Sequence, residues 1–293
     1  MIFFDFTSTK KLSAIFKIAL SASLYGCLGY LGTVLLHNQM STPAMLFWRF
    51  SIASLWMLPF LFKGMNIIKS TNKSMLLIIF IFGGICYSGC SGFYFLASQR
   101  IGTGFAMVIY FLYPVLIILF TWLFEREVIS FGMFCAVIGV LIGLILLKGH
   151  SAHELNSLGI VFALLSAISY AAYVYGGQYI ARLLPSHLLT LVVCLGCSFL
   201  FLLLAVLTHT WSYPVNLKMW TAAISLGVFS TALPIQLLLD GMKTIHSTKA
   251  SMLSVLEPTV TVLLGVVLLR ESFSFLQLIG VAIILISALA VQI

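Results

Sequence analysis

Long apolar runs, each about the length of a membrane-crossing helix, dominate the sequence, and most charged residues fall in the short segments between them. A bilayer core of about 30 Å is crossed by about 20 helical residues. Applied to this pattern, that length predicts ten transmembrane helices in an all-α integral membrane protein. The predicted spans are 14–35, 42–62, 75–97, 104–124, 130–147, 158–181, 187–208, 218–239, 249–269 and 275–292.

The composition indicates that lipid surrounds most of the chain. Of its 293 residues, 62% are hydrophobic and 8% are charged, whereas a soluble domain carries about 25% charged residues. The net charge of +8 comes from Lys and Arg between the apolar runs, where positive charge sets membrane topology. The sequence has no basic stripe with interleaved aromatic residues, so we expect no nucleic-acid partner.

The positive charges also predict the orientation in the membrane. Ten Lys and Arg residues fall on the side of the N-terminus, four fall on the opposite side, and Arg49 lies within a helix. Because cytoplasmic segments are enriched in Lys and Arg, both termini are predicted to be cytoplasmic in an inner or plasma membrane. Lys10 and Lys11 precede an apolar run without a small-residue cleavage site, so the first segment is expected to remain as a helix.

An internal repeat divides the chain into two halves. A shift of 144 residues, from 101 to 245, lays IGTGFAMVIYFLYPVLIILFTWLFEREVISF over IHSTKASMLSVLEPTVTVLLGVVLLRESFSF. The shift aligns Pro114 with Pro258, and one further residue aligns Tyr25 with Tyr170. Five helices in each half is an odd number, so the two halves are predicted to have opposite topology. The predicted domains are the inverted five-helix repeats 1–147 and 148–293.

The two aligned prolines, Pro114 and Pro258, are the expected helix breaks, because proline removes a backbone hydrogen bond. Inverted repeats with helices interrupted at matching positions are typical of alternating-access transporters. The alternative for each proline is a simple kink between packed helices, which neighbouring groups can satisfy. The matched pair within matched repeats favours a transporter.

These features resemble the drug/metabolite transporter superfamily, and within it the EamA branch. Five-plus-five helices, an Arg in the second helix and a Pro in the fourth and ninth helices carry the resemblance. So does the acidic residue that closes those two helices, in YPVLIILFTWLFERE (113–127) and LEPTVTVLLGVVLLRE (256–271). The resemblance spans the whole chain and implies two inverted bundles around a central cavity, with export or exchange of amino acids or other small metabolites. The seventh helix has no counterpart of Arg49, so any role of Arg49 in binding comes from the first repeat alone.

Glu257 is the only acidic residue near the middle of a predicted helix. Burying its ionised form costs on the order of several kcal/mol, so the side chain is expected to face a cavity, find a partner or stay protonated. In a cavity it could bind a cationic amine or carry a coupling proton. Pro258 frees a carbonyl near Ser254, which could add a polar ligand. The alternative is a protonated Glu257 that hydrogen-bonds to a neighbouring helix and stabilises the bundle.

Arg49 lies about 10 Å from the outer end of the second predicted helix. At that depth its planar guanidinium could bind a substrate carboxylate. It could equally anchor the helix at the outer interface or pair with a helix end.

Five tyrosines are the other polar groups at the expected core. Tyr110 and Tyr113, like Tyr170 and Tyr173, are three residues apart and share roughly one helix face, while Tyr25 lies on the first helix. Facing a cavity, they could stack on a substrate and hydrogen-bond its polar end. The alternative for each is ordinary packing or a place in an interfacial aromatic belt.

No cofactor and no metal site are predicted. The six cysteines lie in apolar runs without His, where Cys behaves as a small buried apolar residue, and His150 with His153 alone would make a poor metal site. The sequence contains no GxxxxGK[ST] nucleotide-binding motif. The expected partners are therefore a lipid bilayer, a small-molecule substrate and a coupling proton, with no required protein partner.

The leading hypothesis is a secondary transporter of amino acids or amino-acid derivatives that works by alternating access, powered by proton coupling or exchange. Within the same class, the alternative is an exporter of hydrophobic cationic drugs or amines. A channel is disfavoured because no ring of like charges or filter-like loop is visible. An intramembrane enzyme is disfavoured because paired acids, HExxH and a nucleophile with its base are all missing from the sequence.

Overall fold

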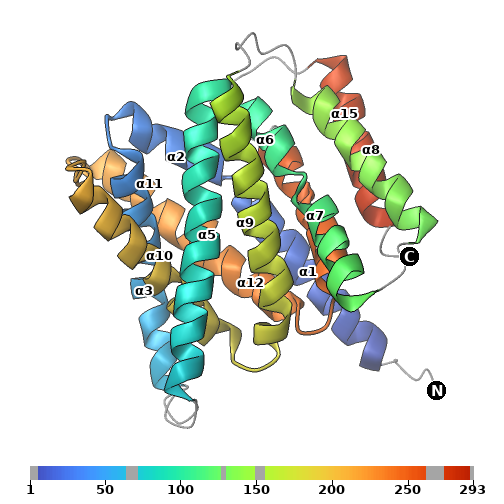
Figure 1. Cartoon of the computed structure of the whole chain (residues 1–293), viewed down its shortest axis with the longest axis horizontal. Coiled ribbons are helices and arrows are strands. Elements are labelled where there is room, and N and C mark those ends of the chain that lie inside the picture. Colours follow the sequence, from blue (N-terminus) through green and yellow to red (C-terminus); the bar gives the residue numbers. More distant parts are fainter. Residues whose placement is uncertain (1–5, 64–71, 127–129, 149–155, 262–273, 291–293) are drawn as a thin grey trace.

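A computed structural model of the chain describes residues 6–63, 72–126, 130–148, 156–261 and 274–290 (Figure 1). Within these ranges the chain forms helices joined by turns and contains no strand. The expected all-α fold is thus confirmed for the described part of the chain.

The described residues of the first half form eight helical elements. They are α1 (Phe6–Tyr25), α2 (Leu28–His37), α3 (Thr42–Lys63), α5 (Lys73–Ile101), α6 (Thr103–Tyr110), α7 (Tyr113–Phe120), the π-helix η1 (Thr121–Glu125) and α8 (Phe131–Lys148). The short breaks between α1 and α2, and between α6 and α7, leave pairs of helices that continue one another.

The second half has a similar series of elements. They are α9 (Ser157–Ala181), α10 (Ser186–Leu207), α11 (Leu217–Gly227), the π-helix η2 (Val228–Ala232), α12 (Leu233–Gly241), α13 (Ser247–Ser254) and α15 (Phe275–Ala290). After a turn at Val255, residues 256–261 are again helical. The predicted span 249–269 is described only as far as residue 261, and Glu127, Arg270 and Glu271 lie outside the described residues.

Six helical stretches in the described ranges are long and apolar enough to cross a membrane. They are Lys10–His37, Lys73–Ile101, Ala106–Glu125, Ser157–Ala181, Ser186–Leu207 and Leu217–Gly241. The helices α8 and α15 contribute the shorter apolar stretches Phe131–Leu146 and Leu278–Ser287.

The outer surface of the bundle carries many large apolar side chains. Examples are Leu77, Phe134 and Val206, which are 58%, 56% and 54% exposed. A water-soluble protein rarely leaves so continuous an apolar surface uncovered, whereas hydrocarbon is the solvent that such a surface requires. The protein is therefore a multi-pass membrane protein.

Asparagine side chains determine where three of the long helices begin. Asn72 accepts a hydrogen bond from the backbone N–H of Ser74 at 3.0 Å, and Asn216 accepts one from Met219 at 2.8 Å. Asn156 caps α9 in the same way, through Gly159 at 3.2 Å. Each cap satisfies an N–H group that has no partner inside its own helix, which fixes the first turn at a polar segment.

Helices from the two halves interlock rather than forming two separate bundles. The most extensive contacts pair α5 with α9, α3 with α10, α8 with α15 and α5 with α10, followed by α1 with α12. In Figure 1, α8 and α15 lie side by side at one edge of the molecule, while α5 and α9 run along its middle. Glycines allow close approach: a Cβ on Gly196 of α10 would lie 3.0 Å from Gly84 Cα on α5.

Candidate functional site

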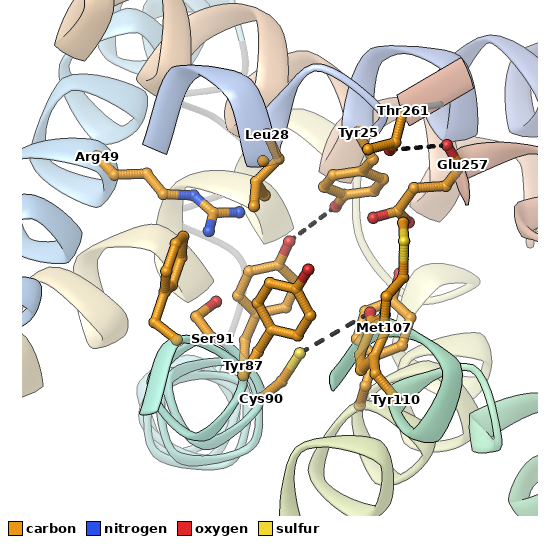
Figure 2. Close-up of a pocket in the computed structure, with 14 residues that line it drawn as sticks. Tyr25, Leu28, Arg49, Tyr87, Cys90, Ser91, Met107, Tyr110, Glu257 and Thr261 are labelled. Atoms are coloured by element: carbon orange, nitrogen blue, oxygen red, sulfur yellow. Dashed lines mark hydrogen bonds between the residues drawn. The ribbon is translucent and has the colours of Figure 1, made fainter. Parts of the chain in front are cut away.

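A cavity lies between broken helices and the long helices α5 and α9 (Figure 2). Its empty volume is about 560 Å³, part of which is open to the surroundings. Its walls consist of Tyr25, Leu28, Gly29, Arg49, Tyr87, Cys90, Ser91, Tyr94, Phe95, Met107, Tyr110, Tyr170, Glu257 and Thr261. Aromatic and polar side chains together make a wall that suits a small molecule with both apolar and polar parts.

One basic and one acidic side chain face this cavity from different helices. Figure 2 shows the guanidinium of Arg49, on α3, and the carboxyl group of Glu257 pointing into the space between them. The ion pairs in the described part of the chain all involve other residues, so neither Arg49 nor Glu257 has an ionic partner there. A buried charge normally needs a partner, so this arrangement leaves room for a ligand that bears both charges.

Arg49 is 2% exposed and is held by neighbours on two sides. Its Nε donates a hydrogen bond to Thr231 Oγ1 of η2 at 2.7 Å. Its Cζ lies 5.0 Å from the centroid of the Phe50 ring, a distance at which the ring attracts the cation. Arg49 is therefore an interior residue fixed by a second helix, and it does not reach out to the membrane interface.

Glu257 reaches the cavity because the chain is interrupted just before it. Helix α13 ends at Ser254, Val255 forms a turn, and Pro258 lies in the first turn of the next helical segment. There the missing N–H of proline costs nothing. Among the described residues the Glu257 carboxyl group has no hydrogen-bond partner, whereas its backbone carbonyl accepts from Thr261 Oγ1 at 3.0 Å.

A second broken helix packs against this segment. Between α1 and α2 the chain turns at Gly26, whose carbonyl oxygen also lies 3.0 Å from Thr261 Oγ1, so the Gly26 and Glu257 carbonyls share the one hydroxyl hydrogen of Thr261. A Cβ on Gly26 would lie 2.8 Å from Val260 Cβ and 3.1 Å from the Glu257 carbonyl oxygen. Only glycine permits this approach, which brings Tyr25 and Glu257 to the same wall.

Helix α5 supplies the largest share of the wall. Tyr87, Cys90, Ser91, Tyr94 and Phe95 are spaced as i, i+3, i+4, i+7 and i+8, which is one face of an α-helix. The sequence analysis did not select this face. The signal that could have identified it is the stripe of hydroxyl and thiol groups at helical spacing within an otherwise apolar run.

The tyrosines form a connected aromatic cluster. Tyr87 donates a hydrogen bond to the Tyr25 hydroxyl at 2.9 Å, and the Cys90 thiol lies 4.0 Å from the Tyr110 hydroxyl (Figure 2). The rings of Tyr110 and Tyr170 are 5.5 Å apart. Interlocked rings of this kind hold one another in place, so the aromatic wall is preorganised.

The structure brings five of the predicted site residues into the cavity wall: Tyr25, Arg49, Tyr110, Tyr170 and Glu257. Tyr113, Tyr173 and Ser254 are buried behind that wall and do not line it. Tyr113 packs edge-on against Tyr170 at 4.7 Å. Ser254 donates to the Ala250 carbonyl at 3.1 Å.

A second, smaller cavity lies along the same helices. It is lined by apolar groups and one tyrosine: Ile79, Phe82, Gly83, Tyr173, Gly177, Ile180, Leu189, Val193 and Leu239. The ring of Tyr173 is 4.8 Å from that of Tyr87, which belongs to the wall of the larger cavity. The pair Tyr87 and Tyr173 therefore separates the two cavities.

A polar network built around Glu125 joins three helical segments beyond the smaller cavity. The carboxylate accepts from Gln178 Nε2 at 3.2 Å and from the Tyr179 hydroxyl at 2.5 Å. His246, at the start of α13, lies 3.2 Å from the same carboxylate. Gln178 is eight residues beyond Tyr170, or about 12 Å along α9, so this network is distant from the larger cavity.

A second network ties α1 to α12 at the same end of the molecule. Asp240 pairs with Lys17 and, at 3.1 Å, with Lys243, and it accepts a hydrogen bond from Ser186 at 3.1 Å. The two networks link first-half helices to second-half helices. They close the end of the bundle that carries Lys17 and Lys243, here called the lysine-rich end.

No metal centre is found in the described ranges. They contain no group of three or more His, Cys, Asp or Glu side chains that could hold an ion, and each of the six cysteines is free.

The comparisons with known proteins agree with this architecture. An "Uncharacterized inner membrane transporter YicL" of Salmonella typhimurium is 26% identical over 97% of this chain and 96% of its own length. An "Uncharacterized transporter YcbK" of Bacillus subtilis is 29% identical over 57% of this chain, and the match spans only about half (56%) of YcbK. A solved crystal structure superposes with a TM-score of 0.80 over 97% of this chain and 96% of its own, at 22% identity, which shows the same fold.

The model of the EamA-like transporter family matches residues 12–148 and again residues 157–292. Two matches in tandem cover nearly the whole chain and confirm the resemblance drawn from the sequence. The chain belongs to the EamA-like transporter family and is a membrane transporter of the drug/metabolite type.

Proposed function

We propose that the protein is a secondary transporter that carries amino acids or amino-acid derivatives across the membrane by alternating access. The observation that carries the proposal is that Arg49 and Glu257 face one aromatic cavity and form no ion pair within the described ranges. A ligand with a carboxylate and an ammonium group would neutralise both. Each charge would gain a partner that the described part of the chain does not supply.

The rest of the cavity suits an amphiphilic ligand. Tyr94, Phe95 and Met107 offer apolar and polarisable surface, and the Tyr25 and Tyr87 hydroxyls lie between the two charges (Figure 2). A side chain of moderate size would pack on the rings while its polar end meets Arg49 and Glu257.

Ten membrane crossings in two inverted repeats, 1–147 and 148–293, are part of the proposal. The chain breaks at matching positions of the two halves, between α6 and α7 before Pro114 and after α13 before Pro258. The pairing of α1 with α12 and of α5 with α9 is what an exchange of the two repeats would produce. These features support a pseudo-two-fold arrangement of the kind used for alternating access.

Alternating access is supported by the asymmetry along the bundle axis. The larger cavity lies on one side of Tyr87 and Tyr173, and the Glu125 and Asp240 networks close the other side. Rearrangement of those networks would open the lysine-rich end. Following the positive-inside rule, we place that end and both termini in the cytoplasm, in the inner membrane named for YicL.

Glu257 is also the candidate for a coupling proton. Its carboxyl group lacks a hydrogen-bond partner in the described ranges, so it can exchange a proton with the cavity. Proton binding and amine binding would then compete at one site, which couples the two.

An exporter of hydrophobic cations or amines is the second candidate. It is favoured by one observation, namely that Arg49 already donates to Thr231, while Glu257 faces the aromatic wall and its carboxyl group has no partner among the described residues. A cation could use Glu257 and the rings without Arg49.

Thermal stability of the purified protein against a panel of amino acids, amines and amphiphilic cations tests the proposal. A ligand that binds only the folded state raises Tm by mass action. We expect zwitterions to stabilise the wild type, and Glu257→Gln and Arg49→Ala each to lose the effect. Arg100→Gln is the matched control, since Arg100 donates to the Leu96 carbonyl and lies outside the cavity wall.

Each hit would then be loaded into proteoliposomes for counterflow of the labelled compound. Saturable exchange that fails in Glu257→Gln supports the carrier. Stabilisation by hydrophobic cations alone, retained in Arg49→Ala, would replace the amino-acid hypothesis with the amine exporter. Binding that survives both substitutions would remove these two residues from the site.

A further inference from the structure

The hydroxyl of Thr231 lies inside a π-helical turn, η2, between α11 and α12. This hydroxyl donates to the Leu226 carbonyl at 2.7 Å, five residues back in the chain. A hydroxyl has one hydrogen to donate, and this one is used within the turn. The oxygen of Thr231 is therefore available to Arg49 only as an acceptor.

For that reason, the hydrogen bond between Arg49 and Thr231 can run in one direction only, with Arg49 as the donor. Arg49 Nε donates to Thr231 Oγ1 at 2.7 Å, across 182 residues of sequence. The Nε–H is one of five donors on the guanidinium, and the other four belong to the two terminal amino groups. In the described ranges those four make no hydrogen bond to protein, and Figure 2 shows the terminal nitrogens directed into the cavity.

The backbone of the two helices is built for this approach. A Cβ on Gly227, the residue before η2, would lie 3.0 Å from the Arg49 carbonyl oxygen and 2.7 Å from Ile52 Cβ. Glycine at this position lets α3 and the π-turn come close enough for Arg49 to reach Thr231. π-Turns of this kind occur frequently at functional sites.

We propose that Thr231 is a positioning residue that sets the rotation of the Arg49 guanidinium, so that its two terminal amino groups present a fork to a ligand carboxylate in the cavity. Holding Nε on one side leaves the edge that pairs with a carboxylate through two parallel hydrogen bonds. The class of ligand group at this position is a carboxylate. The inference rests on the proposed amino-acid function and adds the residue that makes Arg49 selective.

The test uses three variants and three probes. Thr231→Val removes the acceptor at equal size, Thr231→Ser retains it, and Ser230→Ala is the control within the same π-turn. Ser230 is buried, and its hydroxyl has no hydrogen-bond partner in the described ranges. The probes are L-leucine, L-leucinamide, which has no carboxylate, and 4-methylpentanoate, which has no amine.

We expect Thr231→Val to weaken binding of L-leucine and 4-methylpentanoate by about tenfold, since a hydrogen bond to a charged group is lost from the preorganised site. Binding of L-leucinamide should change by less than about twofold. Thr231→Ser and Ser230→Ala should both bind as the wild type does. This pattern across probes separates positioning from general damage, which would affect all three probes alike.

Two results would overturn the inference in different ways. If wild type binds L-leucine and Thr231→Val binds it equally or more tightly, Thr231 does not position Arg49, and the proposed function stands. If wild type binds neither carboxylate probe, the amino-acid function fails and this inference fails with it.

Discussion

The two proline breaks share a backbone design but carry different chemistry. In the first half α6 ends at Tyr110 and α7 begins at Tyr113, followed by Pro114. In the second half α13 ends at Ser254, and the helix resumes at residue 256, shortly before Pro258. The alignment of the halves places Tyr110 opposite Ser254 and Tyr113 opposite Glu257.

Which residue of each break meets the cavity is reversed between the halves. Tyr110 lines the cavity and Tyr113, 0% exposed, packs behind it. Glu257 lines the cavity, and Ser254 lies behind it. A repeated backbone can thus supply an aromatic surface from one half and a charge from the other, which a strictly symmetric site could not provide for an asymmetric ligand.

Moving the charge to the other break is the change with the largest expected effect. Tyr113→Glu places a carboxyl group among the rings of Tyr110, Phe111 and Tyr170, where burial without a partner costs about 3 kcal/mol or more. We expect a strongly lowered Tm or loss of folded protein on size-exclusion chromatography. Glu257→Gln, which removes a charge from the cavity, should retain or raise Tm, and equal losses in the two variants would contradict the comparison.

Gly26→Ala disturbs the second break alone and ranks next. The added methyl group would collide with Val260 and crowd the Glu257 carbonyl, and overpacking of this kind costs about 1–3 kcal/mol. A fall in Tm of several degrees, with weaker ligand binding, is the expected outcome of a thermal-shift series. Gly132→Ala on α8 is the control, since nothing lies within 4 Å of a Cβ there; the idea fails if both variants behave alike.

Thr261→Val tests the bridge between two broken helices. Its hydroxyl contacts the carbonyls of Gly26 and Glu257, each at 3.0 Å. Losing that hydroxyl should cost about 1 kcal/mol, seen as a drop in Tm that Thr261→Ser restores. Thr259→Val is the matched control, because the buried Thr259 hydroxyl has no hydrogen-bond partner in the described ranges. A larger loss at Thr259 than at Thr261 would show that the bridge is not what joins the two breaks.

Much of the fold could be predicted because lipid imposes a length on apolar runs. The predicted spans 158–181 and 187–208 agree closely with α9 and α10. The span 75–97 ends early because α5 continues through polar residues to Ile101. Arg100 there donates to the Leu96 carbonyl and lies over the Phe162 ring, so a charged residue is accommodated within the helix.

The candidate site was most clearly marked where a charge interrupts an apolar run, although the predicted Tyr25, Tyr110 and Tyr170 also line the cavity. Arg49 and Glu257 stand out for that reason, whereas the wall on α5 does not, since Tyr, Cys and Ser occur throughout apolar helices and only packing decides which face turns inward. Thr231 and Thr261 act on partners 182 and 235 residues away, and one sequence contains no record of such pairing.

The two tyrosine pairs show that a spacing of three residues does not ensure that both side chains face the same cavity. Residues three apart differ by about 60° around a helix, so Tyr170 can line the cavity while Tyr173 faces the smaller one. Tyr110 and Tyr113 are separated by the break itself, which resets the phase. A rule that places residues three apart on one face therefore overlooks the 60° offset within α9 and the break between α6 and α7.

Tyr110→Phe has the smallest expected effect, and it tests whether the first proline break contributes a polar group to the cavity. The Tyr110 hydroxyl meets the Cys90 thiol at 4.0 Å, and a thiol is a weak donor. Its loss should therefore shift stability by less than about 0.5 kcal/mol. In a thermal-shift titration with L-leucine we expect Tm and affinity close to those of the wild type, because the first break contributes ring surface and not a polar ligand.

Tyr110→Leu should weaken binding, since it removes the ring that packs against Tyr94 and Tyr170 at 5.6 and 5.5 Å. A loss of affinity in Tyr110→Phe equal to that in Tyr110→Leu would instead make the hydroxyl a ligand and give both breaks a polar role.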